Sequence, residues 1–182
     1  MNVLITGVSF GLGKSLKNQY LNMGKNVYGL SRTEVTDCKH KIFDLSILSD
    51  DTYSKVLEDL LEGQKYFVVC ISSGASQNTY KGWGGYSISK AALRMMMKVY
   101  SKDILETHFT SLAPGLVDTK MQKHLCNEVD ITEFPETSKF IESRDKGITR
   151  SSDDVAKDVV KIIPDLLDLE SGSYIDLRYG VK

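Results

Sequence analysis

The sequence predicts an α/β fold with a doubly wound parallel sheet, in a single domain that covers residues 1–182. Short apolar runs alternate along the chain with segments in which apolar residues recur at helical spacing. Strands that alternate with helices are typical of parallel sheets, because parallel neighbours need a long crossover connection. A length of 182 residues is enough for one domain with a sizeable core.

The apolar runs predict six strands. The run Tyr-Phe-Val-Val-Cys-Ile at 66–71 gives the strongest signal, because it is rich in β-branched and aromatic residues. The first run ends at glycines, and Pro114-Gly115 follows the fifth, so each is bounded by residues that break strands. The six expected strands cover residues 3–5, 26–30, 41–43, 66–71, 108–112 and 173–177.

Helical periodicity predicts four helices between these strands. Gly24 ends the first and Gly63 the second, since glycine commonly follows the last turn of a helix. Ser152-Asp153-Asp154 caps the last helix. Residues 116–150 are expected to be irregular or short-helical, and the polar stretch before Lys41 is too short for a crossover helix. The expected helices cover residues 14–23, 50–62, 86–106 and 155–163.

Composition excludes several classes of partner. A net charge of −1 and a pI near 6.3 give no general attraction to nucleic acid or to an anionic membrane. No apolar run reaches the length of a membrane span, and the N-terminus enters a strand pattern without a leader. Three distant cysteines and three scattered histidines suggest neither disulfides nor a metal site. A cytoplasmic location is expected.

The segment Thr6–Gly13 spaces its glycines as GxxxGxG between the first strand and the first helix. In this context glycines allow a tight turn, a close approach of the backbone to a pyrophosphate, and close packing of helix on strand. The helix N-terminus then offers N–H groups to phosphate. The alternative is a glycine-rich turn without a ligand. The residues predicted to contact a dinucleotide here are Gly7, Ser9, Phe10, Gly11, Leu12 and Gly13.

The end of the second strand predicts the choice of dinucleotide. An NAD site usually has an acidic side chain there, for the ribose 2′-hydroxyl. This chain has Ser31 and Arg32 instead. The planar guanidinium of arginine suits a 2′-phosphate, and serine adds a donor. The sequence therefore favours NADP(H), although Arg32 could instead be a solvated loop charge.

Tyr86 and Lys90 lie four residues apart at the start of a helix, on one face. An ammonium near a phenol favours the phenolate, and such a tyrosine can exchange a proton with a carbonyl oxygen. Lys90 could also hold the ribose hydroxyls. Ser73 follows the 66–71 strand, where its hydroxyl could polarise the same carbonyl. A tyrosine–lysine pair alone is often only a solvated helix face.

The segment 114–119 follows the next strand and is expected to bind the nicotinamide carboxamide through its backbone and Thr119. Ligands of open α/β sheets bind beyond the carboxyl ends of the strands, where all these features are predicted to lie. The residues predicted to contact the cofactor here are Pro114, Gly115, Val117 and Thr119.

Together these motifs resemble the short-chain dehydrogenase/reductase family, which has a Rossmann-like fold. The resemblance runs nearly end to end, and stretches 73–93, 113–122 and 151–178 are similar to bacterial benzil reductases and sepiapterin reductases. It implies reduction of a ketone or diketone with NADPH, with Tyr86 as proton donor, Lys90 tuning it and Ser73 positioning the carbonyl. It also implies that Asp44 contacts the cofactor. Trp83, Met121 and residues 122–147 would shape the substrate pocket, or else be core or lid packing.

The chain departs from the family between Asp44 and Ser73, which leaves room for only one helix and one strand. A strand with an Asn-Asn-Ala-Gly-like end and a helix with a catalytic asparagine are expected to be missing. This predicts six strands rather than seven, with the 66–71 strand paired directly to the 3–5 strand. The absent helix normally forms half of the family's dimer interface, so any homo-oligomer would have an altered interface.

Two hypotheses follow. The first is a working NADPH-dependent carbonyl reductase, favoured by the retention of Ser73, Tyr86, Lys90 and Thr119. The second is an impaired remnant that binds dinucleotide or a protein partner without turnover, favoured by the missing unit.

Overall fold

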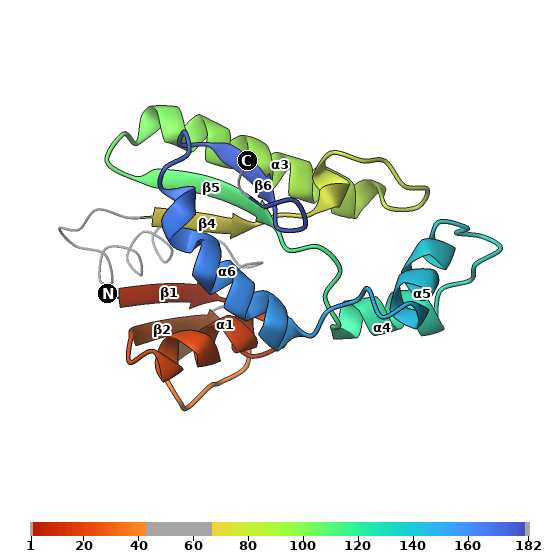
Figure 1. Cartoon of the computed structure of the whole chain (residues 1–182), viewed down its shortest axis with the longest axis horizontal. Coiled ribbons are helices and arrows are strands. Elements are labelled where there is room, and N and C mark those ends of the chain that lie inside the picture. The colour runs from red at the N-terminus through yellow and green to blue at the C-terminus, as the bar shows by residue number, and fades with distance from the viewer. Residues whose placement is uncertain (1, 43–66, 181–182) are drawn as a thin grey trace. The chain divides into compact units, whose positions relative to one another are not determined.

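The computed structural model describes residues 2–42 and 67–180 (Figure 1). These residues form two compact units, 2–42 and 67–180, each built around a parallel sheet of three strands. The α/β fold class is therefore confirmed. Asp44, the 50–62 helix and Tyr66 lie outside the described residues. The predicted pairing of the 3–5 strand with the 66–71 strand would join the two units and stays a prediction, as does the single domain.

The first unit is a βαββ arrangement. Its strands pair in the order β1-β2-β3, all parallel, and α1 packs against β1 and β2. Leu16 and Tyr20 of α1 are buried together with Val27 and Leu30 of β2, so the apolar face predicted from the sequence forms the core. The elements are β1 (Asn2–Thr6), α1 (Gly11–Asn22), β2 (Asn26–Ser31) and β3 (Lys39–Ile42).

No helix connects β2 to β3, as the short polar stretch predicts. The connection is attached to α1 by an ion pair between the buried Lys17 and Asp37, whose nitrogen and oxygen lie 2.5 Å apart. The hydrogen bond from Lys17 lowers the pKa of the Asp37 carboxyl. Strand β3 begins at Lys39, two residues before the predicted start, because polar residues pair there with Tyr28 and Gly29.

The second unit holds strands β4, β5 and β6, which pair in parallel with β5 in the centre. Helix α3 packs against β4 and β5, and α4 packs against α5. Phe109, Leu112 and Ala113 of β5 are buried, as expected for a central strand. The elements are β4 (Phe67–Ile71), η1 (Gly74–Ser76), α3 (Gly84–Asp103), β5 (His108–Ala113), α4 (Lys120–Asn127), α5 (Thr137–Asp145), α6 (Ser152–Leu166) and β6 (Ser173–Asp176).

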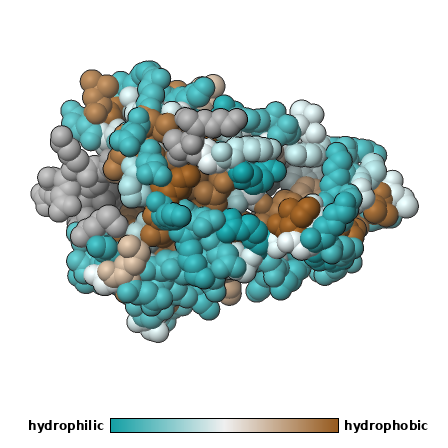
Figure 2. All heavy atoms as spheres, in the orientation of Figure 1, coloured by the Kyte–Doolittle hydropathy of each residue, from teal (hydrophilic) through white to brown (hydrophobic). Residues whose placement is uncertain are grey.

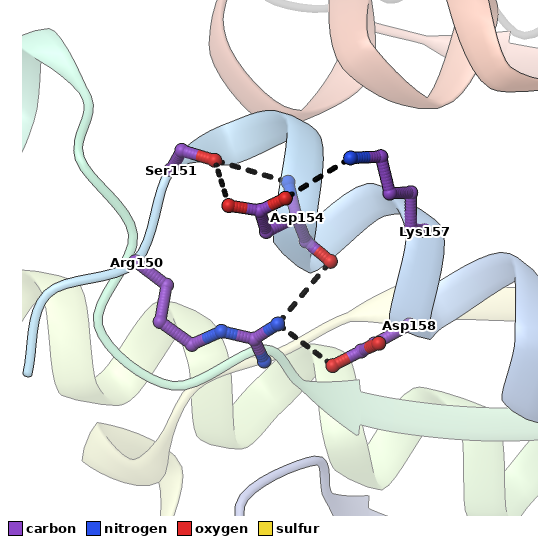
Figure 3. A network of polar contacts seen from close by, with 5 residues as sticks. All are labelled: Arg150, Ser151, Asp154, Lys157 and Asp158. Atoms are coloured by element: carbon purple, nitrogen blue, oxygen red, sulfur yellow. Dashed lines mark hydrogen bonds and ion pairs between the residues drawn. The ribbon is translucent and has the colours of Figure 1, made fainter.

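The N-cap of helix α6 is Ser151, one residue before the predicted cap, so the helix begins at Ser152 rather than at Val155 (Figure 3). The Ser151 hydroxyl oxygen accepts a hydrogen bond from the backbone N–H of Asp154 (3.1 Å) and donates to the Asp154 carboxylate (2.7 Å). Lys157 pairs with the same carboxylate, and Arg150 pairs with Asp158. The predicted cap at Ser152-Asp153-Asp154 is thus corrected to Ser151, with Asp154 as its partner.

The visible face of the molecule is largely hydrophilic, with hydrophobic residues gathered in a few patches (Figure 2). A charged fraction of 26% accounts for this.

The short helices α4 and α5 bear out the prediction that 116–150 is irregular or short-helical.

Candidate active site

The glycine segment after β1 has the conformations that its spacing predicts. Gly7 and Gly11 have φ angles of 74° and 53°, which side-chain-bearing residues rarely adopt. The N–H of Gly7 donates to the carbonyl oxygen of Leu30 (2.7 Å) and so ties the turn to β2. A Cβ at Gly13 would overlap the carbonyl oxygen of Gly7 and lie 2.9 Å from its carbonyl carbon. Gly13 is therefore required by the close approach of α1 to the turn.

The N-terminus of α1 fits the pyrophosphate of a dinucleotide. Its N-cap residue is Phe10, in an extended conformation and without a side-chain hydrogen bond to the helix. The first N–H groups of a helix have no partner within the helix, and they attract anions. Ser9 and Leu12 are half-buried in this segment, whereas Phe10 is 57% exposed. The three glycines of this segment thus present only backbone to a ligand, whereas Phe10 also presents its ring.

Ser31 and Arg32 differ in what they can offer to a phosphate. The Ser31 hydroxyl is buried, donates to the carbonyl oxygen of Thr33 (2.8 Å) and lies 2.9 Å from Nε2 of His40. Its proton is therefore already used. Arg32 is exposed, and within the described part of the chain its guanidinium forms no hydrogen bond or ion pair. Arg32 is the better candidate for a 2′-phosphate. Asp44 lies outside the described residues.

Tyr86 and Lys90 occupy the first two turns of α3. The Lys90 Nζ lies 5.9 Å from the centre of the Tyr86 ring, so the predicted pair shares one face. The same Nζ donates a hydrogen bond to the carbonyl oxygen of Ile71 (2.9 Å), the last residue of β4. Burial lowers the pKa of the Lys90 ammonium. Among the described residues, none forms a hydrogen bond with the Tyr86 hydroxyl.

Ser73 lies two residues beyond β4 and is the N-cap of η1. Its Oγ accepts a hydrogen bond from the N–H of Ala75 (3.2 Å), and its carbonyl oxygen accepts one from the Tyr174 hydroxyl (3.4 Å). The Ser73 hydroxyl proton thus stays available for a substrate. Ser72 and Ile71 both bond to Lys90, so the structure brings the Ser73 segment and the start of α3 together.

The 114–119 segment leaves the carboxyl end of β5. Gly115 has a φ angle of 79°, and Val117 forms an isolated parallel bridge with Arg150. Thr119 is the N-cap of α4, and its Oγ1 accepts a long hydrogen bond from the N–H of Gln122 (3.4 Å). The hydroxyl proton of Thr119 is not used by this cap, and Pro114 is half-buried.

This chain is similar to known proteins in both sequence and fold. The profile of the short chain dehydrogenase family matches residues 41–130. Over these residues, just under half of its length, the chain is similar to the short-chain dehydrogenase/reductase family. Proteins of this family are oxidoreductases that use a nicotinamide dinucleotide.

Two relatives and one solved structure show how far the similarity extends. A benzil reductase of Bacillus subtilis is 26% identical, over 98% of this chain and 97% of the relative. A benzil reductase of Bacillus cereus is 33% identical, but the match spans 53% of this chain and 40% of that protein. The crystal structure of the Saccharomyces cerevisiae protein YIR035C has the same fold, with a TM-score of 0.79 at 19% identity over 97% of this chain and 95% of that one.

The alignment with the Bacillus subtilis protein spans 244 positions, whereas this chain has 182 residues. It therefore contains positions at which the relative has residues and this chain has none. This agrees with the internal deletion predicted from the sequence.

An aromatic cluster beside Tyr86 includes residues that the sequence did not single out. Trp83 stacks on Phe140 of α5, with ring centres 5.1 Å apart and an angle of 9° between the rings. The Trp83 ring also meets the Tyr86 ring edge-on, at 5.5 Å and 86°. Tyr80 and Phe134 extend the cluster, the latter against Gly82. The segment 122–147 thus contacts Trp83, whereas Met121 is 57% exposed.

Among the described residues, no three His, Cys, Asp or Glu side chains lie close enough together to bind a metal ion. In the same part of the chain, no helix is long and apolar enough to cross a membrane.

Proposed function

We propose that this chain is an NADPH-dependent carbonyl reductase that acts on a ketone or diketone. The observation that carries the proposal is the position of Lys90, beside the Tyr86 ring and bonded to the end of the strand that precedes Ser73. The names of the two Bacillus relatives support a diketone substrate, since both are benzil reductases.

The residues present fit this cofactor. Gly7 has open space where a side chain would lie, and Gly13 lets α1 approach the turn closely, so the backbone N–H groups of this segment could bind a pyrophosphate. Arg32 makes no polar contact with the other described residues, and its guanidinium would bind the 2′-phosphate. In the second unit, the 114–119 segment would bind the carboxamide. When bound, NADPH supplies the hydride that reduces the carbonyl carbon.

The protein's own groups supply and direct the proton. The Tyr86 hydroxyl donates its proton to the substrate oxygen, which becomes the hydroxyl of the product alcohol. The Ser73 hydroxyl donates a hydrogen bond to the same oxygen and orients the carbonyl. The Lys90 ammonium stabilises the phenolate left on Tyr86 until a proton returns from solvent. Trp83 and Phe140 form an apolar wall suited to an aromatic substrate.

The second candidate function is dinucleotide binding without turnover, favoured by the residues that the alignment leaves without counterparts in this chain. Any self-association would then use an interface different from the family's. The three unpaired cysteines, Cys38, Cys70 and Cys126, favour a reducing, cytoplasmic setting for either function.

The test is NADPH oxidation with benzil, followed in the parent chain, in Tyr86→Phe and in Tyr100→Phe. Tyr100 lies on the same helix and is exposed, so its variant controls for loss of a phenol. Turnover in the parent and in Tyr100→Phe, with at least a hundredfold loss in Tyr86→Phe, supports the reductase. Binding of NADPH without turnover in the parent supports the second function instead.

A further inference from the structure

Arg178 reaches from the end of β6 across the ends of the other two strands in its sheet. The register pairs Ala113 with Asp176, so Gly115 and Arg178 stand two residues beyond a paired position. A Cβ at Gly115 would lie 3.2 Å from Cγ and 3.4 Å from Cδ of Arg178. A Cβ at Gly74 would lie 3.4 Å from its Nη2. The guanidinium therefore lies next to the residue that follows Ser73.

The Arg178 guanidinium is held in a fixed orientation. Asp176 accepts hydrogen bonds from its Nε (2.9 Å) and its Nη2 (2.6 Å), a bidentate pairing. The Asp176 side chain is 10% exposed, whereas that of Arg178 is 51% exposed. The pairing uses two of the five N–H groups of the guanidinium. Three N–H groups of this half-exposed side chain thus remain outside the pairing.

Glycine at position 74 is not required by the backbone. Gly115 has a left-handed φ angle, but Gly74 does not. A side chain at position 74 would start in contact with Nη2 of Arg178. Because position 74 has no side chain, the guanidinium lies directly beside the segment that carries the Ser73 hydroxyl.

We propose that Arg178 is a specificity-determining residue that binds a second oxygen of the substrate, adjacent to the carbonyl that is reduced. The inference rests on the proposed function and narrows its substrate class to compounds with two neighbouring oxygen acceptors. A preoriented guanidinium recognises such an acceptor without having to be ordered on binding. The acceptor can be the second carbonyl of a vicinal diketone or the carboxylate of a 2-oxo acid.

The test compares three substrates of similar size: phenylpropanedione, phenylglyoxylate and propiophenone, which lacks the second oxygen. In Arg178→Met, kcat/KM for the diketone falls roughly tenfold to a hundredfold, while that for propiophenone changes less than about twofold. A similar fall for phenylglyoxylate alone assigns the carboxylate as the preferred acceptor. An equal fall for all three substrates, or none for either dicarbonyl, overturns the inference.

Two variants keep the test interpretable. Because Arg178→Met leaves Asp176 without its partner, Asp176→Asn/Arg178→Met is measured beside it. Arg150→Met removes another arginine whose ion pair, with Asp158, is of similar length (2.7 Å) and leaves the substrate ratio unchanged.

A binding measurement separates this inference from the proposed function. If the parent reduces none of the three compounds, the reductase assignment fails. Quenching of the single tryptophan, Trp83, by phenylpropanedione then decides about Arg178. A weaker dissociation constant in Arg178→Met than in Arg150→Met supports the contact, and equal constants refute it.

Discussion

The ammonium of Lys90 donates a hydrogen bond to the carbonyl oxygen of Ile71, which attaches the second turn of α3 to the last residue of β4. Tyr86 stands one turn earlier on the same face, and Ser73 stands two residues beyond Ile71. One lysine thus links the two segments that carry the proposed proton donor and the proposed carbonyl-orienting hydroxyl.

Lys90→Met should separate activity from stability. Carbonyl reduction should fall at least a hundredfold, because the phenolate of Tyr86 loses its neighbouring cation. Burial lowers the pKa of Lys90, so the folded state binds this proton less tightly than the unfolded chain does. Burial of the protonated Lys90 side chain therefore lowers the free energy of unfolding at neutral pH. This penalty disappears as pH rises through the lowered pKa towards 10.5.

The measurement is thermal unfolding of the parent and of Lys90→Met at pH 7 and at a pH near 10. The parent should gain stability relative to the variant as pH rises. A constant difference between the two proteins would show that the lysine carries no such penalty.

The sequence predicts best those site residues that lie close together along the chain. Tyr86 and Lys90 share a helix, and Ser73 follows a strongly apolar strand, so spacing alone predicts where they lie. Phe140 and Arg178 are far along the chain from the groups they approach. Their positions depend on how α5 stacks and on the β5–β6 register, which local patterns do not encode.

The same limit explains the errors in element bounds. Strand β3 starts at Lys39 rather than at Lys41 because Lys39 and His40 also pair with β2. These two polar residues lie outside the apolar run that predicts the strand. The cap of α6 is Ser151 rather than Ser152, since either serine suits the pattern and only the geometry of Asp154 selects one.

Arg32→Ala should weaken NADPH binding roughly tenfold or more and leave NADH binding nearly unchanged, because only NADPH carries the phosphate that this guanidinium would bind. Lys25→Ala is the matched control, since Lys25 precedes β2 whereas Arg32 follows its carboxyl end. Calorimetric titration of both cofactors checks this. Equal weakening of both cofactors would exclude a phosphate contact.

Gly13→Ala should destabilise the first unit and abolish dinucleotide binding, because the new Cβ would meet backbone atoms of Gly7. Gly24→Ala is the control, since Gly24 has a φ angle of 66° with open space around it. Its cost should be roughly 1–2 kcal/mol, from backbone strain alone. Urea unfolding compares the two variants, and equal losses would argue against the close approach at Gly13.

Phe140→Ala should shift the emission of Trp83 to longer wavelength, because the indole loses the ring that stacks on it and meets more water. Trp83 is the only tryptophan, so the signal has one source. Ile148→Ala removes an exposed apolar side chain just beyond α5 and should leave the emission unchanged. An unshifted spectrum in Phe140→Ala would mean that α5 does not cover Trp83.

Ser151→Ala should cost about 1 kcal/mol at pH 7, the usual loss for an N-cap hydroxyl. The hydrogen bond from Ser151 is the largest cause that lowers the pKa of Asp154, ahead of that from Lys157. The stabilisation from the hydrogen bond between the Ser151 hydroxyl and the ionised Asp154 carboxylate is therefore fully present above the ordinary aspartate pKa of 3.8. It is lost as pH falls through the lower pKa that Asp154 has in the folded state. Urea unfolding should show a difference between parent and variant that shrinks below about pH 4.

Ser151→Thr keeps the hydroxyl and should behave as the parent does, so a loss equal to that of Ser151→Ala would contradict the capping role (Figure 3).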